Sequence, residues 1–453
     1  MESPTTETLR ADFDVPLRAA VISAEPHAPR ESSLAAVHQV LSDRDTVEIV
    51  SHDALGSDET FDLAFVVHAL GPTAAGAALA AAGVPAMCLE PYCGYHAYHA
   101  AFYRELEDAG GTPLPADLPE TIAASVQAVR ARRALRGMKL IVADPGDDEH
   151  RNARLRHFAA RAGERMGIEV LIRSTDEIKE RARGVADAAA EAELQRWYAG
   201  ILTGPGEMDA DHMRQVARLY LAQRDMLDET GAVGITPHDI KGFLTIPEPE
   251  VMPNVSYGPL LFDGFLVCEE ADIEALTTEL LLAAGLGRRG MMSNIYYAYR
   301  DRFAALESEH DYTPELELAD CRQCFEDNHV AISHFSTAGV LPPAMMQESR
   351  YEVRETLPCW PGQSMIAATP QLGPVLLARL DVGAEALHLV HGDADGTGFG
   401  DQYGWHRGRW FVHLPDARAF AARALHHHYI IVPFADDRGR LTTLCKLLGI
   451  QER

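Results

Sequence analysis

The first two thirds of the chain alternate short apolar, β-branched runs with helical patterns, and this alternation constrains the possible folds most strongly. Buried strands are predicted at residues 17–23, 47–51, 63–68 and 85–89. Helices are predicted at residues 33–41, 74–82, 95–109 and 120–135. Because strand–helix–strand repeats build parallel sheets covered on both faces, we expect a parallel α/β unit here.

A second series of the same kind begins near residue 138. Strands are predicted at residues 138–143, 169–173, 233–236 and 260–267. Helices are predicted at residues 150–166, 176–197, 209–229 and 273–284. None of the turns after these strands carries GxGxxG or GxxxxGK[ST], so the sequence gives little support to a dinucleotide or P-loop nucleotide site.

The pattern changes from about residue 315, where short alternating runs are separated by Gly, Pro and Asp turns. Strands are predicted at residues 330–335, 363–369, 375–380, 385–390, 410–414 and 429–432, followed by a helix at 440–448. Such spacing is typical of a mostly antiparallel β domain. We therefore expect two Rossmann-like α/β domains with parallel sheets, followed by a β-rich C-terminal domain.

The length of 453 residues also favours several domains, because one hydrophobic core rarely serves so long a chain. The expected first domain spans residues 1–137. The second spans residues 138–314 and carries Glu269 and Asn294. The third spans residues 315–453 and carries His334 and His428.

The net charge of −27 disfavours nucleic acid and anionic membranes as partners, since both require a positive face. The main basic run, residues 130–136, is interpreted as the solvated end of a helix. Residues 1–14 lack the pattern of a signal peptide, and no apolar stretch is long enough to cross a bilayer, so a cytoplasmic location is expected. The seven cysteines are expected to be reduced thiols, and the pair Cys321 and Cys324 lacks the second pair that a zinc site needs.

The segment from Cys268 to Asp272 is the first candidate for chemistry. It follows a predicted strand and precedes a predicted helix, and carboxylates at such a junction lie at the ligand-binding edge of a parallel sheet. Glu270 and Asp272 also suit the first turn of a helix, where they complement the helix dipole. Both interpretations stay open on the pattern alone.

The histidines His426, His427 and His428 precede an apolar predicted strand and are the second candidate. Imidazole is a common transition-metal ligand, and alternate residues of a strand face the same way. Asn294 and His334 are further candidates, with a turn residue and a hydrogen-bonded core histidine as the alternatives. The glycine- and aspartate-rich residues 392–404 suit either a loop that closes over a ligand or a surface hairpin.

In these segments the chain resembles the L-fucose isomerase-like family, whose relatives include L-arabinose isomerase. The matching features are Cys268-Glu269 followed by Ala275-Leu276-Thr277, the Met-Ser-Asn-Ile run, His334 in its strand, and Gly408-Arg409 with the later His-His-Tyr and the final helix. The resemblance covers roughly residue 138 to the end and lies in the order and spacing of these features.

The resemblance implies a manganese-dependent aldose–ketose isomerase, with Mg²⁺ or Co²⁺ as alternative ions, that works through an enediol. It assigns Glu269 as a metal ligand and acid/base group, and His428 as the metal histidine. His427 is the alternative metal histidine. His427 and His334 are also assigned as contacts to the substrate. Because the register of the triple histidine is ambiguous, His426 also remains a possible metal ligand. It also implies a homo-oligomer, either a trimer or a hexamer, and a small sugar-like substrate.

Asn294 stands where the family has its second carboxylate. An amide oxygen can bind Mn²⁺ or Mg²⁺, but it cannot accept a proton near neutral pH. Another group must then act as the second acid/base, such as Glu270, Asp272, His334 or a hydroxide on the metal. The leading expectation is isomerisation or epimerisation of a sugar-like polyol. The alternatives are another metal-assisted reaction, such as elimination, or a carbohydrate-binding or regulatory protein without turnover.

Overall fold

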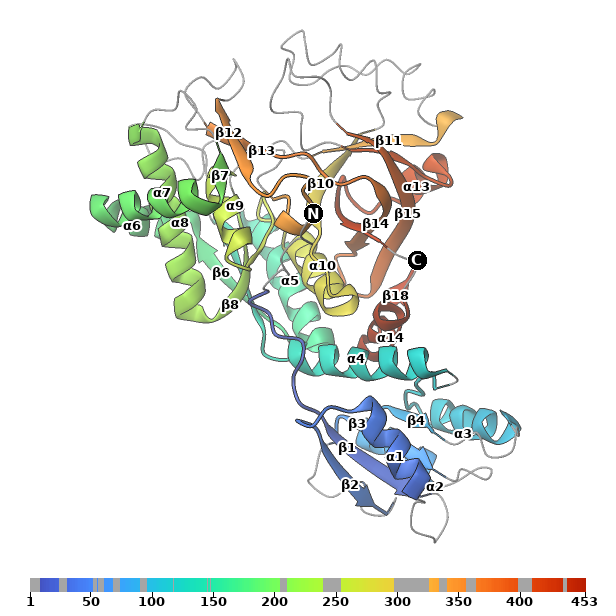
Figure 1. Cartoon of the computed structure of the whole chain (residues 1–453). Helices are drawn as coiled ribbons and strands as arrows, with labels where there is room; N and C mark the ends of the chain where they lie inside the picture. The colour runs from blue at the N-terminus through green and yellow to red at the C-terminus, as the bar shows by residue number, and fades with distance from the viewer. Residues whose placement is uncertain are drawn as a thin grey trace.

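The computed structural model describes residues 9–23, 31–51, 55, 61–67, 74–89, 96–116, 118–144, 146, 148–203, 210–238, 254–296, 326–333, 340–355, 364–397, 410–434 and 438–453. Figure 1 shows a small parallel sheet in blue at one end of the molecule. A second parallel sheet and an antiparallel sheet lie together at the other end. The expectation of a mixed α/β chain with parallel sheets is confirmed.

The first sheet has the order β2-β1-β3-β4 and is parallel throughout, as predicted. Alternate residues of its central strand face opposite sides, so Val21 joins the main hydrophobic core and Ile22 joins a separate cluster. Burial on both faces explains why these strands are almost wholly apolar. The elements are β1 (Arg18–Ser23), α1 (Glu31–Val40), β2 (Thr46–Val50), β3 (Leu63–Val67), α2 (Ala74–Ala82), β4 (Ala86–Cys88) and α3 (His96–Asp108).

The second sheet has the order β6-β5-β8-β9 and is also parallel. Its strands are β5 (Lys139–Asp144), β6 (Glu169–Ser174), β8 (Ala232–Pro237) and β9 (Leu266–Val267). Its helices are α5 (Glu149–Met166), α6 (Thr175–Gly184), α7 (Asp187–Gly200), α8 (Ala210–Thr230), α9 (Asn254–Phe262) and α10 (Ile273–Leu286). This sheet places the end of β9 and the start of α10 at its carboxyl edge, where ligands bind in open α/β sheets.

Two predictions in this region are wrong. Residues 176–197 form two helices because Val185 and Ala186 adopt extended backbone, with ψ of 127° and 144°, directly after the poor helix former Gly184. Residues 260–267 are not one strand: α9 ends at Phe262 and β9 has only two residues. A short apolar run does not distinguish a buried helix from a buried strand, which explains this error.

The C-terminal strands form an antiparallel sheet, as predicted, and among the described residues this sheet closes on itself. Its order is β14-β17-β10-β11-β16-β15, and β15 pairs back with β14. Strand β10 falls in the expected range 138–314, and its hydrogen-bonded neighbours are β11 and β17 of this sheet. The strands are β10 (Met291–Tyr296), β11 (His329–Ser333), β14 (Gly373–Leu380), β15 (Ala386–Thr397), β16 (Trp410–His413) and β17 (His428–Pro433).

Smaller elements complete the described chain. Strands β7 (Leu202–Thr203), β12 (Tyr351–Glu355) and β13 (Ser364–Ala367) form a separate sheet, and β18 (Gln451–Glu452) pairs with β15. The remaining helices are η3 (Pro343–Met345), α13 (Ala417–Arg423) and α14 (Gly439–Leu448). None of the helices in the described part of the chain combines the length and the apolar composition needed to cross a bilayer.

Helix α4 (Pro119–Leu135) connects the blue sheet to the rest of the molecule (Figure 1). It packs against α14 and α10 on one side and contacts α1 on the other. The interpretation of residues 130–136 as a solvated helix end is wrong for Arg130, which is 2% exposed. Its guanidinium binds the buried carboxylate of Asp45, so this basic residue lies inside the fold.

Candidate functional site

The turn between β9 and α10 has an unusual backbone. Glu270 and Ala271 are consecutive non-glycine residues with positive φ, 60° and 51°. Each such residue costs about 1–3 kcal/mol, and strained backbone of this kind is concentrated at functional sites. Two main-chain hydrogen bonds hold the turn, from Ala271 N to Pro237 O at 2.9 Å and from Asp272 N to Glu269 O at 3.1 Å. The turn therefore presents the Glu270 side chain in a conformation that its sequence alone disfavours.

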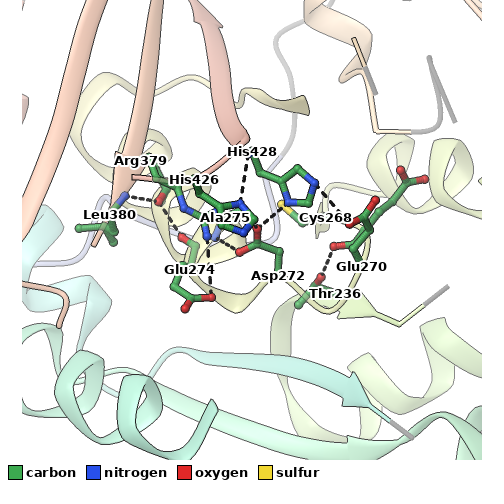
Figure 2. Close-up of polar contacts among 12 residues, drawn as sticks. Thr236, Cys268, Glu270, Asp272, Glu274, Ala275, Arg379, Leu380, His426 and His428 are labelled. Atoms are coloured by element: carbon green, nitrogen blue, oxygen red, sulfur yellow. Dashed lines mark hydrogen bonds and ion pairs between the residues drawn. The ribbon is translucent and has the colours of Figure 1, made fainter. Parts of the chain in front are cut away.

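Asp272 connects this turn to the closed antiparallel sheet. Its Oδ1 accepts a hydrogen bond from Ala275 N at 2.9 Å and caps α10, so the helix-capping interpretation is confirmed for this residue. Its Oδ2 accepts hydrogen bonds from Arg379 Nη1 at 2.7 Å and from His428 Nδ1 at 2.8 Å (Figure 2). One carboxylate thus joins the start of α10 to strands β14 and β17.

His428 is buried, with 2% of its surface exposed. Because its Nδ1 donates to Asp272, Nε2 is the ring nitrogen that remains for a ligand. The Glu270 Oε2 atom lies 3.3 Å from this Nε2 (Figure 2). A carboxylate behind a histidine fixes the ring and raises its basicity, as is usual for metal-bound histidines. The arrangement suits His428 to bind a divalent cation together with Glu270.

The two preceding histidines differ from His428. Burial lowers the pKa of His426 to about 3, with Arg379 adding to the effect, and burial lowers the pKa of His427 to about 4, with His428 adding to it. Both rings are therefore neutral at pH 7. His426 Nδ1 accepts a hydrogen bond from His428 N at 3.2 Å, which places the proton of His426 on Nε2. The three rings offer nitrogen atoms within 4.8 Å of one another. Because the unprotonated nitrogen of His426 already accepts a hydrogen bond, His427 is the better candidate for a second imidazole ligand.

Three arginines hold the acidic residues of the site. Arg379, 2% exposed, binds Asp272, and Arg154 of α5 binds Glu274 Oε1 at 2.9 Å. Arg151 donates to the main-chain oxygen of Glu270 at 2.8 Å. Burial by itself raises the pKa of Asp272, but Arg379 and His428 outweigh it and hold the pKa well below its usual range. Asp272 is therefore a fixed anion that orients its neighbours rather than a group that exchanges protons.

A cavity of about 230 Å³ opens at these residues. Its lining includes Glu270, Asp272, the three histidines, Arg151 and Arg154. A second cavity, of about 400 Å³, shares Arg154, Glu274 and His426 with it and extends toward Leu425. Together they have the dimensions of a small-molecule site with several polar groups.

The structure brings together some of the residues predicted from the sequence. Asn294 is directly opposite His428 in the pairing of β10 with β17, so the two side chains share a face of the sheet. Glu269 is 1% exposed at the end of β9, and neither it nor Asn294 belongs to the lining of the cavity among the described residues. His427 lines the cavity. His334 and most of residues 392–404 lie outside the described residues.

Sequence reasoning did not identify Arg379, Arg151 or Arg154. Arg379 is 107 residues from Asp272 along the chain, and its contact with that carboxylate depends on β14 packing against α10. Arg151 and Arg154 belong to a helix with an ordinary amphipathic pattern. No local signal in these segments indicates the site.

Comparisons with known proteins identify no family for this chain. No family model matches it, and no curated protein matches it. Among solved structures, a crystal structure named as a two-component system response regulator/ggdef domain protein matches 50% of this chain and 83% of its own chain. That match has 15% sequence identity and a TM-score of 0.23, and it carries no argument about fold or function.

Proposed function

We propose that this protein is a metal-dependent enzyme that isomerises or epimerises a small, sugar-like polyol at the cavity beside His428. The observation that carries the proposal is the orientation of His428, whose Nδ1 donates to Asp272 while its Nε2 faces Glu270. A histidine held in this way is suited to bind a cation. The resemblance of these segments to the L-fucose isomerase-like family supports the choice of substrate class.

The donor atoms fit a divalent cation such as Mn²⁺, with Mg²⁺ or Co²⁺ as alternatives. His428 and Glu270 would hold it, with His427 as the favoured second imidazole ligand. Asn294, opposite His428 in the strand pairing, and Glu269, next to Glu270 in the sequence, are further oxygen donors. Imidazole and carboxylate together suit such ions. The cation would polarise two neighbouring oxygens of the substrate as a Lewis acid.

The remaining roles are proton transfer and positioning of the substrate. Asp272 and Glu274 are each bound to an arginine, whereas the Glu270 carboxylate faces the His428 imidazole. Glu270 lines the cavity and has two carboxylate oxygens, so it could bind the cation through one oxygen and, through the other, take a proton from one carbon of the substrate and return it to the neighbouring carbon. A single base suffices when both transfers occur on one face of the substrate. Asn294 can position a hydroxyl group by hydrogen bonding without exchanging a proton.

Metal content provides the first test. The protein is loaded with Mn²⁺, desalted and analysed by mass spectrometry, in the wild type and in His428→Ala and Glu270→Ala. About one ion per chain is expected in the wild type and a large loss in both variants. His38→Ala is the matched control, because His38 is exposed on α1 in the first α/β unit.

Catalysis is tested separately, by NMR in D₂O, with a panel of pentoses, hexoses and 6-deoxy sugars. Conversion of a substrate into its isomer or epimer is expected, with or without deuterium at C1 or C2, and Glu270→Gln should abolish it. Metal binding without conversion of any sugar would reject isomerisation and epimerisation, and would leave another metal-assisted reaction or a binding protein. No retained metal in the folded wild type would reject the proposed site itself.

A further inference from the structure

A cavity of about 300 Å³ lies between the first parallel sheet and helix α4, away from the histidine site. Phe61, Asp62 and Gly83 line it from the sheet region, and Arg132, Arg133 and Arg136 line it from α4. Three arginines and one carboxylate are therefore among the residues that line this cavity. This excess of positive charge is notable in a chain with a net charge of −27.

The single carboxylate is already engaged. Asp62 Oδ2 binds the Arg133 guanidinium and also accepts a hydrogen bond from Arg18 N at 2.8 Å. Within the part of the chain that the structure describes, Arg132 and Arg136 form no ion pair through their side chains. Asp62, which pairs with Arg133, thus compensates the charge of Arg132 only in part, and Arg136 has no ion-pair partner among the described residues.

Arg132 and Arg136 also repel each other. They are four residues apart at the end of α4, so they lie on the same face of the helix, and like charges at this spacing are unfavourable. Arg132 is partly buried, and this burial, together with the charge of Arg136, lowers the pKa of its guanidinium from the ordinary value. A solvated surface arginine would not carry this burial cost.

The end of α2 offers one internal source of compensation, because the C-terminus of a helix carries partial negative charge. Two of its last carbonyl groups are already occupied, however. Leu79 O accepts from Val84 N at 3.1 Å, and Ala80 O accepts from Gly83 N at 3.0 Å. The helix end therefore does not replace a full counter-anion.

We propose that this cavity binds a small phosphate-bearing anion, either free phosphate or a phosphate monoester, between Arg132 and Arg136. Two remaining guanidinium groups match the charge of a phosphate dianion, and the planar guanidinium pairs with phosphate oxygens through two hydrogen bonds. Its volume of about 300 Å³ suits a small ligand. Because the lining comes from both α4 and the first sheet, the bound anion fastens that sheet to the rest of the molecule.

The test is calorimetric titration of the full chain with inorganic phosphate at constant ionic strength. Wild type should bind in the millimolar range or tighter, and Arg132→Ala and Arg136→Ala should each weaken binding at least tenfold. Arg132→Lys should weaken it less, since the charge remains. Arg183→Ala is the matched control, because Arg183 is an exposed arginine in the last turn of another helix, α6.

Thermal unfolding and a second ligand complete the experiment. Phosphate should raise the Tm of wild type by about 1–3 °C and leave the Tm of Arg132→Ala unchanged. Tighter binding of glycerol 3-phosphate than of phosphate identifies a phosphate monoester as the ligand, and equal affinity identifies free phosphate. The proposal is overturned if folded wild type binds neither compound at up to about 10 mM, or if Arg132→Ala and Arg136→Ala bind as the wild type does.

Discussion

Two buried aspartates of this protein each bind a buried arginine, and they differ in what else they contact. Asp45 in the first α/β unit binds Arg130, and its oxygens also accept from Leu17 N and Ser42 N, both at 2.7 Å. Asp272 binds Arg379, caps α10 through Ala275 N, and accepts from the His428 ring. Among the described residues, the first carboxylate contacts groups of the framework, whereas the second also contacts a side chain that lines a cavity.

The further contacts of each aspartate distinguish a structural ion pair from one that belongs to the candidate site. Both pairs are almost fully buried, so burial and charge alone do not distinguish them. The distinction lies in the third partner. At Asp45 the remaining hydrogen bonds come from the main chain and from Ser42. At Asp272 the third partner is an imidazole whose other nitrogen faces Glu270.

The largest expected effect is on stability at Asp45. Asp45→Ala removes the buried partner of Arg130 and leaves this guanidinium only the more exposed carboxylate of Asp14, at 3.8 Å. We expect the free energy of unfolding to fall by about 3 kcal/mol. Urea denaturation measures this change, and manganese content should stay the same. Asp211→Ala is the control, because Asp211 pairs with Arg214 at the surface and should cost at most about 1 kcal/mol. A loss at Asp45 as small as the control would show that this pair is not structural.

The next effect is on metal affinity at Asp272. Asp272→Asn keeps a side-chain oxygen for the helix cap but removes the charge behind His428, so Mn²⁺ affinity should fall by about 10–100-fold. Equilibrium dialysis measures this change. Asp416→Asn is the matched control, because Asp416 caps α13 through Ala419 N at 2.8 Å. If the Mn²⁺ affinity of Asp272→Asn is unchanged, Asp272 is part of a structural ion pair, as Asp45 is.

A smaller effect is expected from relieving backbone strain in the turn. Glu270→Gly removes the cost of a positive φ, so the free energy of unfolding should rise by about 1 kcal/mol while Mn²⁺ binding weakens. Ala384→Gly, at a φ of 51°, relieves the same backbone cost but also removes a buried methyl group, so it should give a smaller gain and leave metal binding unchanged. Differential scanning calorimetry with and without Mn²⁺ distinguishes these outcomes. A destabilised Glu270→Gly would show that the turn is not strained.

The smallest effect concerns the acid sensitivity of the Asp45 pair. Burial raises the pKa of Asp45, but hydrogen bonds from Arg130 and the main chain outweigh it and lower the pKa below its ordinary value. The ionised form is therefore stabilised by folding. This stabilisation is complete above roughly pH 4, the ordinary aspartate range, and is lost as the pH falls through the lowered folded pKa. The stability difference between wild type and Asp45→Asn should shrink below pH 4, and a constant difference down to pH 2 would contradict the assignment.

The sequence by itself predicted the broad architecture well, because that information is local. Residues 74–82 were predicted as a helix and form α2 with the same bounds, and the apolar run at 63–68 is β3. Periodicity and composition act within a few residues, so they identify buried strands and amphipathic helices directly. The same reasoning was wrong for residues 260–267, where a short, mostly apolar run interrupted by Asp263 and Gly264 carries no clear periodicity.

The sequence also identified the segments that carry the candidate site, namely the acidic turn before α10 and the histidines before β17. It determined which residue types are available there, carboxylates and imidazoles, and hence that metal chemistry is possible. Only the tertiary structure decided that Asp272 holds His428, that Glu270 faces it and that Arg379 neutralises the pair. These contacts join residues more than 100 positions apart, and their energies depend on burial and orientation that exist only once the sheets have packed.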